Sequence, residues 1–151
     1  MKMLPKKGIT PEGYFDYSVY PLEGIWDICG NNNLEEGELD KDSLIYKIMI
    51  RQPHFINQDL VRSASEILKK KKTNKYTDEI KLEEIEDGLS VQIMHTGSYD
   101  SETASFMILK EFCTENKLKI KGTSHKEIYI SNPERTTQEK LKTVLRYFVE
   151  K

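Results

Sequence analysis

Short runs rich in β-branched and aromatic residues alternate along this chain with two segments of helical periodicity, and this alternation restricts the fold more than any other feature. The extended runs span 14–20, 25–28, 44–51, 80–86, 89–95, 125–131 and 143–149. Such a mixture predicts an α+β fold, and two copies of a strand-helix-strand-strand unit would fit it. With 151 residues, the chain suits one domain that spans residues 1–151.

The two helical segments have recognisable ends. Asn57 is the predicted N-cap of a helix from Gln58 to about Lys72, and Asn116 is predicted to end a second helix that follows the turn at 97–100. The apolar residues expected on the buried faces are Leu60, Val61, Ala64, Ile67 and Leu68 in the first helix, and Ala104, Ile108, Leu109 and Phe112 in the second. Because an acidic stretch follows the lysines at 69–72, we interpret them as a solvated face rather than a nucleic-acid site.

Turn-forming residues divide the extended runs. Pro21 is expected to stop a strand at 14–20, and Gly24 is expected to interrupt the path before 25–28. The dipeptide Asp87-Gly88 between two extended runs predicts a β-hairpin. A helical turn is expected near 138–140. The polar segment 31–42 is predicted to be a solvated loop, because its acids miss the ligand spacing and the terminal Glu of a calcium loop.

Charge and composition exclude several classes of partner. The chain has 23 Lys and Arg against 25 Asp and Glu, a formal charge of -2, so no net field favours nucleic acid or an anionic membrane. No segment has the apolar length of a membrane helix or of a signal peptide, and we therefore predict a cytoplasmic protein. Cys29 and Cys113 have no disulfide or zinc spacing and are expected to be reduced, packed thiols.

Motifs of known chemistry are absent from the sequence. It contains no phosphate-binding glycine loop, no His-Glu pair at zinc spacing and no serine elbow. His54, His95 and His125 are scattered, so solvent-facing or hydrogen-bonded roles are favoured over a metal site. Cys113 would be a nucleophile only if a base lowered its pKa. No metal and no cofactor are therefore expected.

One acid stands out in the run 125–131. If Ile128 and Ile130 face the helices, the alternation of a strand places Glu127 and Tyr129 together on the other face. The same argument turns Met94 outward, to the side of Glu127 if both strands belong to one sheet. Such a face could bind a partner or line an apolar pocket, and Glu127 could equally be an ordinary surface residue. In a pocket, Glu127 would attract a cation or act as a general base.

Several segments together resemble the GyrI-like small-molecule-binding family. They are Pro11–Phe15, Pro21–Trp26, Met49–Pro53, Val91–Asp100, His125–Thr136 and the stretch Glu139–Arg146. The resemblance covers nearly the whole chain from about Gly8 onward, and is strongest to the stand-alone branch, some of whose members hydrolyse cyclopropanoid DNA-alkylating compounds.

The resemblance implies a duplicated strand-helix-strand-strand fold, an antiparallel sheet with helices on one side, and a ligand cleft between the two halves. It implies that Glu127 helps water attack the strained ring or serves as a counter-charge to lipophilic cations, as in related multidrug-binding regulators. The residues that match the ligand-binding positions are Tyr17, Trp26, Met94, Tyr99 and Tyr129. The alternative is a non-catalytic ligand sensor, a sequestering protein or a gyrase-inhibitor-like module that binds a protein partner.

Two departures from the family pattern qualify these expectations. The chain begins almost at the segment Pro11-Glu12-Gly13, so the first repeat, 11–72, lacks its opening strand and helix, while 79–151 forms the second half and 1–10 is expected to be disordered. An unpaired sheet edge would follow, which predicts a homodimer through that edge. Relatives tend to have two adjacent tryptophans where this chain has Trp26-Asp27, and an acid there could favour cations or spoil an apolar wall.

Overall fold

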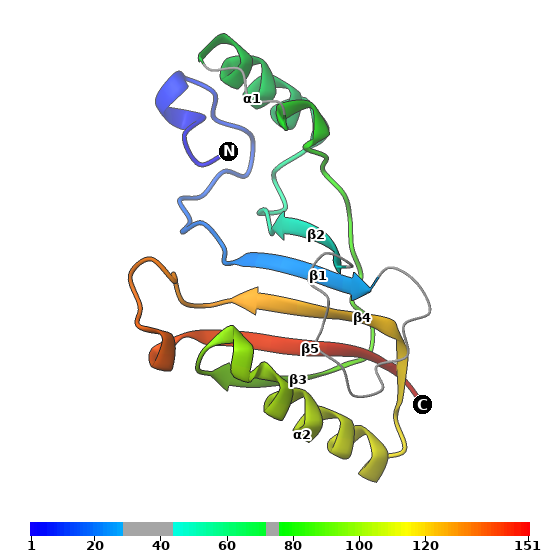
Figure 1. Ribbon diagram of the computed structural model, residues 1–151. Coiled ribbons are helices and arrows are strands. Elements are labelled where there is room, and N and C mark those ends of the chain that lie inside the picture. Colours follow the sequence, from blue (N-terminus) through cyan, green and yellow to red (C-terminus); the bar gives the residue numbers. More distant parts are fainter. Residues whose placement is uncertain (29–43, 72–75) are drawn as a thin grey trace. The chain divides into compact units, whose positions relative to one another are not determined.

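The computed structural model describes residues 1–28, 44–71 and 76–151 (Figure 1). The chain divides into two compact units, each of which contains two separate stretches of sequence. We call residues 1–20 and 52–86 the helical unit, and residues 21–51 and 87–151 the sheet unit. Each unit is described by itself. The predicted loop at 31–42, Cys29 and Lys72 lie outside the described residues.

The sheet unit contains one five-stranded antiparallel sheet with the strand order β2-β1-β4-β5-β3 (Figure 1). The strands are β1 (Leu22–Ile28), β2 (Leu44–Ile50), β3 (Ser90–Thr96), β4 (Lys119–Tyr129) and β5 (Lys142–Glu150). A 3-10 helix, η4 (Tyr99–Ser101), leads into α2 (Glu102–Glu115), and η5 (Gln138–Lys140) precedes β5. The α+β prediction is confirmed.

The second half of the chain forms a complete strand-helix-strand-strand unit, β3-α2-β4-β5. The first half contributes β1 and β2 to the sheet. β2 is the outermost strand of the described sheet, and Ile45, Tyr46, Ile48 and Ile50 are exposed along it. A homodimer through this edge stays a prediction.

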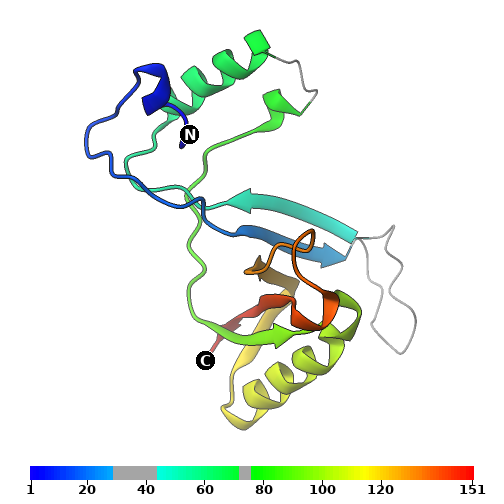
Figure 2. The ribbon, with the colours of Figure 1, turned by 90° about the vertical axis from the view of Figure 1, so that its left-hand side faces the viewer.

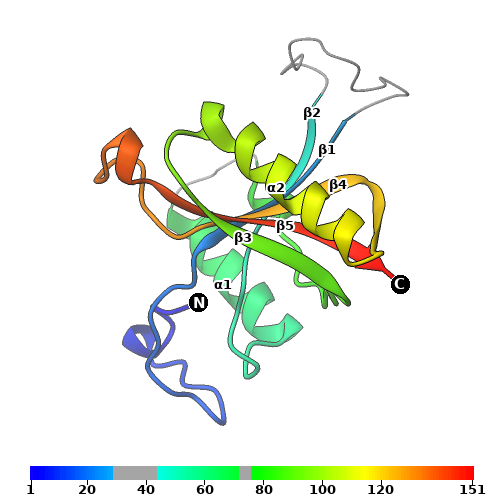
Figure 3. The same ribbon diagram turned by 90° about the horizontal axis from the view of Figure 1, so that it is seen from below.

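The core of the sheet unit lies between β5 and α2, which runs along the sheet near β3 and β5 (Figure 3). Leu145 and Val149 are fully buried because β5 lies between β4 and β3, and Leu109 and Cys113 of α2 are buried as well. The expected helix face is only partly correct, because Ile108 is 55% exposed. Ala104 and Phe112 are also exposed. The residues of α2 that are buried are Glu102, Leu109 and Cys113.

The prediction that Ile128 and Ile130 face the helices is wrong. The Phe106 ring of α2 contacts the rings of His125 and Tyr147, so α2 covers the face of β4 that contains His125, Glu127 and Tyr129. Ile128 therefore points to the opposite face, and Ile130 lies beyond the end of β4 and is 47% exposed. Alternation shows which residues share a face, but it does not show which face a helix covers.

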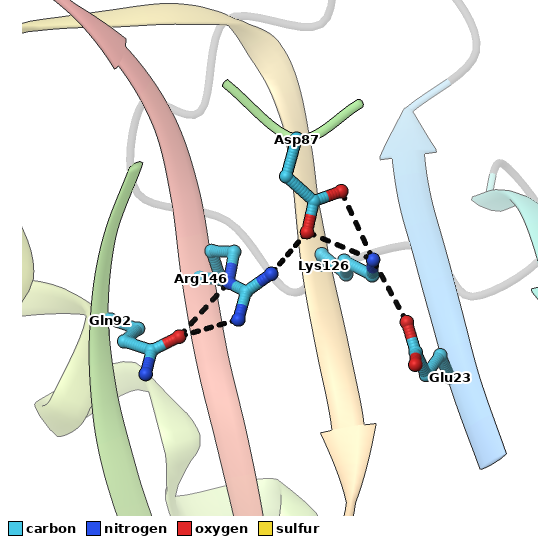
Figure 4. A network of polar contacts seen from close by, with 5 residues as sticks. All are labelled: Glu23, Asp87, Gln92, Lys126 and Arg146. Carbon is cyan, nitrogen blue, oxygen red and sulfur yellow. Dashed lines mark hydrogen bonds and ion pairs between the residues drawn. The ribbon is translucent and has the colours of Figure 1, made fainter. Parts of the chain in front are cut away.

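An ion-pair network occupies that opposite face (Figure 4). Lys126 Nζ lies 2.8 Å from Glu23 Oε2 and 3.0 Å from both carboxylate oxygens of Asp87. Arg146 also pairs with Asp87 and donates to Gln92 Oε1 through Nε at 3.0 Å. Lys126 is only 6% exposed, so its charge is buried with its partners.

The hairpin predicted at Asp87-Gly88 is wrong. Gly88 does adopt a left-handed φ of 62°, as a turn requires, but the segment 80–86 forms no strand and β3 pairs with β5 instead. Asp87 faces Lys126 and Arg146, two residues far away in the sequence. Long-range ion pairs, not a local strand pair, therefore position Asp87.

The helical unit contains η1 (Pro5–Lys7), α1 (Gln58–Lys71) and η3 (Thr77–Glu79), and its N-terminal segment runs beside α1 (Figure 2). Phe55, Ile56 and Val61 form its core. The segment 14–20, predicted as a strand, forms none. Its rings pack on Phe55 instead, with centroid distances of 5.4 Å for Tyr14 and 5.2 Å for Phe15. β1 begins after Pro21 and runs through Gly24 without interruption.

Helix α1 confirms the predicted cap. The Asn57 side-chain Oδ1 accepts a hydrogen bond from the Leu60 N–H at 3.0 Å. We expect Asn57→Ala to destabilise α1 by about 1 kcal/mol, because that N–H loses its partner. Hydrogen exchange of the α1 amides measures this loss. Asn57→Asp keeps an acceptor and should leave exchange nearly unchanged, and equal losses in both variants would contradict the capping role.

Other expectations concern groups of charged and reactive residues. Lys69 pairs with Asp78, which agrees with a solvated lysine face. Cys113 is a free, buried thiol whose pKa is raised by burial, which disfavours a nucleophilic role. Within the described residues, no cluster of His, Cys, Asp and Glu could hold a metal ion. None of the helices in these residues has the length and apolarity needed to cross a membrane.

Candidate functional site

A series of hydrogen bonds on the α2-facing side of the sheet ends at Glu127. The Trp26 indole Nε1–H donates to the Tyr129 hydroxyl at 3.0 Å, and that hydroxyl donates to Glu127 Oε2 at 2.7 Å. His125 Nε2 lies 2.9 Å from Glu127 Oε1, so a proton on this nitrogen is shared with the carboxylate. Both oxygens of Glu127 are therefore held by neighbouring side chains, which fixes the orientation of the carboxylate.

Strand register explains why these side chains meet. His125, Glu127 and Tyr129 alternate along β4 and share one face, and β1 places Trp26 directly opposite His125. Gly24 lies opposite Glu127 in the same pairing. A Cβ on Gly24 would come within 2.7 Å of the Trp26 indole nitrogen, so a glycine leaves the space in which the indole reaches Tyr129.

Aromatic rings extend from this hydrogen-bonded group in two directions. The Tyr99 ring meets Tyr129 edge-on at 5.9 Å, and the Tyr46 ring lies 5.2 Å from Trp26. Tyr46 is 61% exposed and Tyr99 is 41% exposed, whereas Glu127 is only 8% exposed. The arrangement is an accessible aromatic surface with the buried carboxylate of Glu127 beside it, which suits a flat ligand with an apolar body.

Burial keeps Tyr129 and Tyr99 protonated. Desolvation raises the pKa of Tyr129 first of all, and its hydrogen bond to Glu127 and the charge of that group raise the pKa further. Burial also raises the pKa of Tyr99, with smaller effects from Glu102 and Glu127. Both phenols are therefore hydrogen-bond donors across the physiological range of pH.

A second acid, Glu102, lies at the start of α2 and was not singled out by the sequence. It is 8% exposed, and its Oε1 is the one buried side-chain N or O atom in the described part of the chain without a hydrogen-bond partner. Burial, the charge of Glu127 and the charge of Asp100 together raise the pKa of Glu102 to about 8.

The structure brings most of the predicted residues together. Trp26, Tyr129 and Glu127 are hydrogen-bonded in series, and Tyr99 contacts Tyr129. Met94 does not join them. In the sheet, Glu127 pairs with Leu145, and Leu145 pairs in turn with Ile93. Met94 pairs with the adjacent residue, Val144, and therefore lies on the other face. Ile93, not Met94, therefore shares the face of Glu127. Tyr17 belongs to the helical unit, and its role stays a prediction.

Sequence reasoning missed Tyr46, Glu102 and the contact of His125 with Glu127. Tyr46 lies on an exposed edge strand, and its partnership with Trp26 depends on the pairing of β1 with β2. A signal for Glu102 did exist, since it precedes Leu109 and Cys113 on one face of α2. An open groove of about 350 Å³ between α2 and β3 contains none of the predicted ligand-binding residues and not Glu127.

The chain belongs to the family of the GyrI-like small molecule binding domain, whose profile matches residues 6–147. Small-molecule binding is the activity that this family membership supports. A comparison with curated proteins finds no match.

Solved structures of similar sequence have the same fold. A hydrolase from Listeria innocua, solved as a crystal structure, is 31% identical to this chain with a TM-score of 0.85. The match covers 99% of this chain and 72% of the Listeria chain. An uncharacterised conserved protein from the same organism is 34% identical with a TM-score of 0.86, over 97% of this chain and 72% of that protein.

Proposed function

We propose that this protein binds flat, hydrophobic small molecules on the aromatic surface around Glu127 and hydrolyses those that contain a strained cyclopropane ring. The observation that supports this most strongly is the hydrogen-bonded series from Trp26 through Tyr129 to the buried carboxylate of Glu127. The hydrolase description of similar Listeria proteins favours the same class of reaction.

In the proposed reaction, Glu127 is the general base. A water molecule attacks a ring carbon while the carboxylate takes one of its protons, a carbon–carbon bond of the ring breaks, and its electron pair moves into a conjugated acceptor of the substrate. The acceptor takes a proton from solvent, so atoms and charge balance. Tyr129 and His125 hold the base in one orientation, and the rings of Trp26, Tyr46 and Tyr99 hold the flat body of the ligand.

The test compares wild type with Glu127→Gln. Turnover of a cyclopropanoid compound should fall at least about a hundredfold, because the amide cannot accept the proton. Binding of a neutral flat analogue, followed through the single tryptophan, Trp26, should remain. Glu139→Gln, an exposed acid on η5, is the matched control and should behave as wild type.

Other outcomes distinguish the alternatives. Turnover by Glu127→Gln close to that of wild type would remove the hydrolase mechanism. Saturable binding without turnover in wild type would favour a sensor or sequestering protein, with Glu127 as a counter-charge. No saturable binding would favour a protein-binding module. A cytoplasmic location and the absence of direct nucleic-acid binding stay predictions.

A further inference from the structure

Glu102 is a second carboxyl group beside Glu127, and neither the family assignment nor the proposed reaction gives it a role. It begins the helix that covers the Glu127 face, and its charge interacts with Glu127, Tyr99 and Tyr129. Its side chain is nine-tenths buried, with Oε1 unpartnered in the part of the chain that the structure describes. No cation pairs with this group in the described residues, whereas the buried network around Lys126 has two cations, Lys126 and Arg146, for its two acids, Glu23 and Asp87.

We propose that Glu102 sets the charge of the ligand site, keeping it singly negative at neutral pH so that it selects flat ligands with one positive charge or none. This inference rests on the proposed ligand site at Glu127. A buried, unpartnered carboxyl next to another carboxylate holds its proton, because two unscreened negative charges at short range repel each other. When Glu102 loses that proton, the site gains a second negative charge, and cations bind more tightly.

The groups that face Glu102 can be named. Burial opposes the ionisation of Glu102 most, followed by the charges of Glu127 from β4 and Asp100 from η4. Together these effects outweigh the start of α2, where a helix favours a negative charge. The pKa values of Tyr99 and Tyr129 are held above their ordinary value, so both phenols stay neutral where Glu102 titrates. His125 of β4 is bonded to Glu127, and the buried His95 of β3 is hydrogen-bonded to Ser101 and Ser105. A change in ligand affinity near pH 8 that disappears with Glu102 therefore belongs to this residue.

The experiment measures binding of two probes between about pH 6.5 and about pH 9: ethidium, a flat permanent monocation, and phenanthridine, its neutral parent ring. Ethidium affinity of wild type should rise about tenfold over this range, while phenanthridine affinity should not change. Glu102→Gln, which keeps the shape of the side chain, should bind ethidium with no such rise. Glu111→Gln, an exposed acid on the same helix, should match wild type.

A second measurement needs no variant. If ethidium binds more tightly when Glu102 has lost its proton, the binding of ethidium to wild type must release protons near pH 8. The number released equals the slope of the logarithm of the affinity against pH. Calorimetry in two buffers of different ionisation enthalpy counts these protons. An equal rise of affinity in wild type and Glu102→Gln, or no proton release, would overturn the inference and leave the ligand site intact. Failure of both probes to bind wild type would overturn the proposed site itself.

Discussion

Lys126→Met is expected to lower the free energy of unfolding by about 3–5 kcal/mol, because it removes the cation that pairs with the buried Glu23 and one of the two cations that pair with Asp87. The Lys126 side chain is 8% exposed, and its partners Glu23 and Asp87 are 12% and 20% exposed. Asp87 retains Arg146, but Glu23 has no other ion pair in the network of Figure 4. Denaturant unfolding followed by the fluorescence of Trp26, which lies in the same sheet, measures the loss.

The same strand provides a matched control. Lys119 also pairs with an acid, Glu150, at 3.0 Å, but these side chains are 79% and 44% exposed. Solvent screens such a pair, so Lys119→Met should cost less than about 1 kcal/mol. Adding Glu23→Gln to Lys126→Met should recover part of the loss, since it removes a stranded charge. Equal effects at Lys119 and Lys126 would show that burial of the network contributes nothing.

Features that depend on neighbours in sequence could be predicted for this chain. The Asn57 cap, the end of α2 at Asn116 and the 3-10 turn at 138–140 each arise from local hydrogen bonding, and all are present. Glu127 and Tyr129 were placed on one face because a strand repeats every two residues, and their hydrogen bond agrees with this.

Features that depend on distant partners could not be predicted. Asp87-Gly88 has the residues of a hairpin turn, yet Asp87 pairs with residues 39 and 59 positions away. The face of Met94 depends on a register that passes from β3 through β5 to β4, and no local pattern contains it. The cluster of rings on Phe55 uses the aromatic residues of 14–20 that otherwise favour a strand. Side-chain partners, not propensity, decided these elements.

Glu102→Gln is expected to change how stability depends on pH. The pKa of Glu102 rises from an ordinary value of 4.5 to about 8 in the folded protein, so between these values the native state binds more protons than the unfolded state. Stability of wild type therefore falls as pH rises from about 4.5 to about 8, and the contribution of Glu102 is complete below this window and lost above it.

The expected size follows from proton affinity. A tenfold change in proton affinity, which is one pKa unit, corresponds to about 1.4 kcal/mol. As pH rises across this window, the free energy of unfolding of wild type should therefore fall by about 3–5 kcal/mol relative to that of Glu102→Gln. Unfolding of both proteins at several pH values measures the difference, with the exposed Glu111→Gln as control. Parallel stability curves for wild type and Glu102→Gln would mean that Glu102 ionises in the folded protein as freely as in the unfolded chain. A difference in unfolding free energy between the two proteins that becomes smaller towards low pH would instead show that Glu102 holds its proton in the folded structure. The ligand face would then keep one negative charge at the expense of stability at high pH.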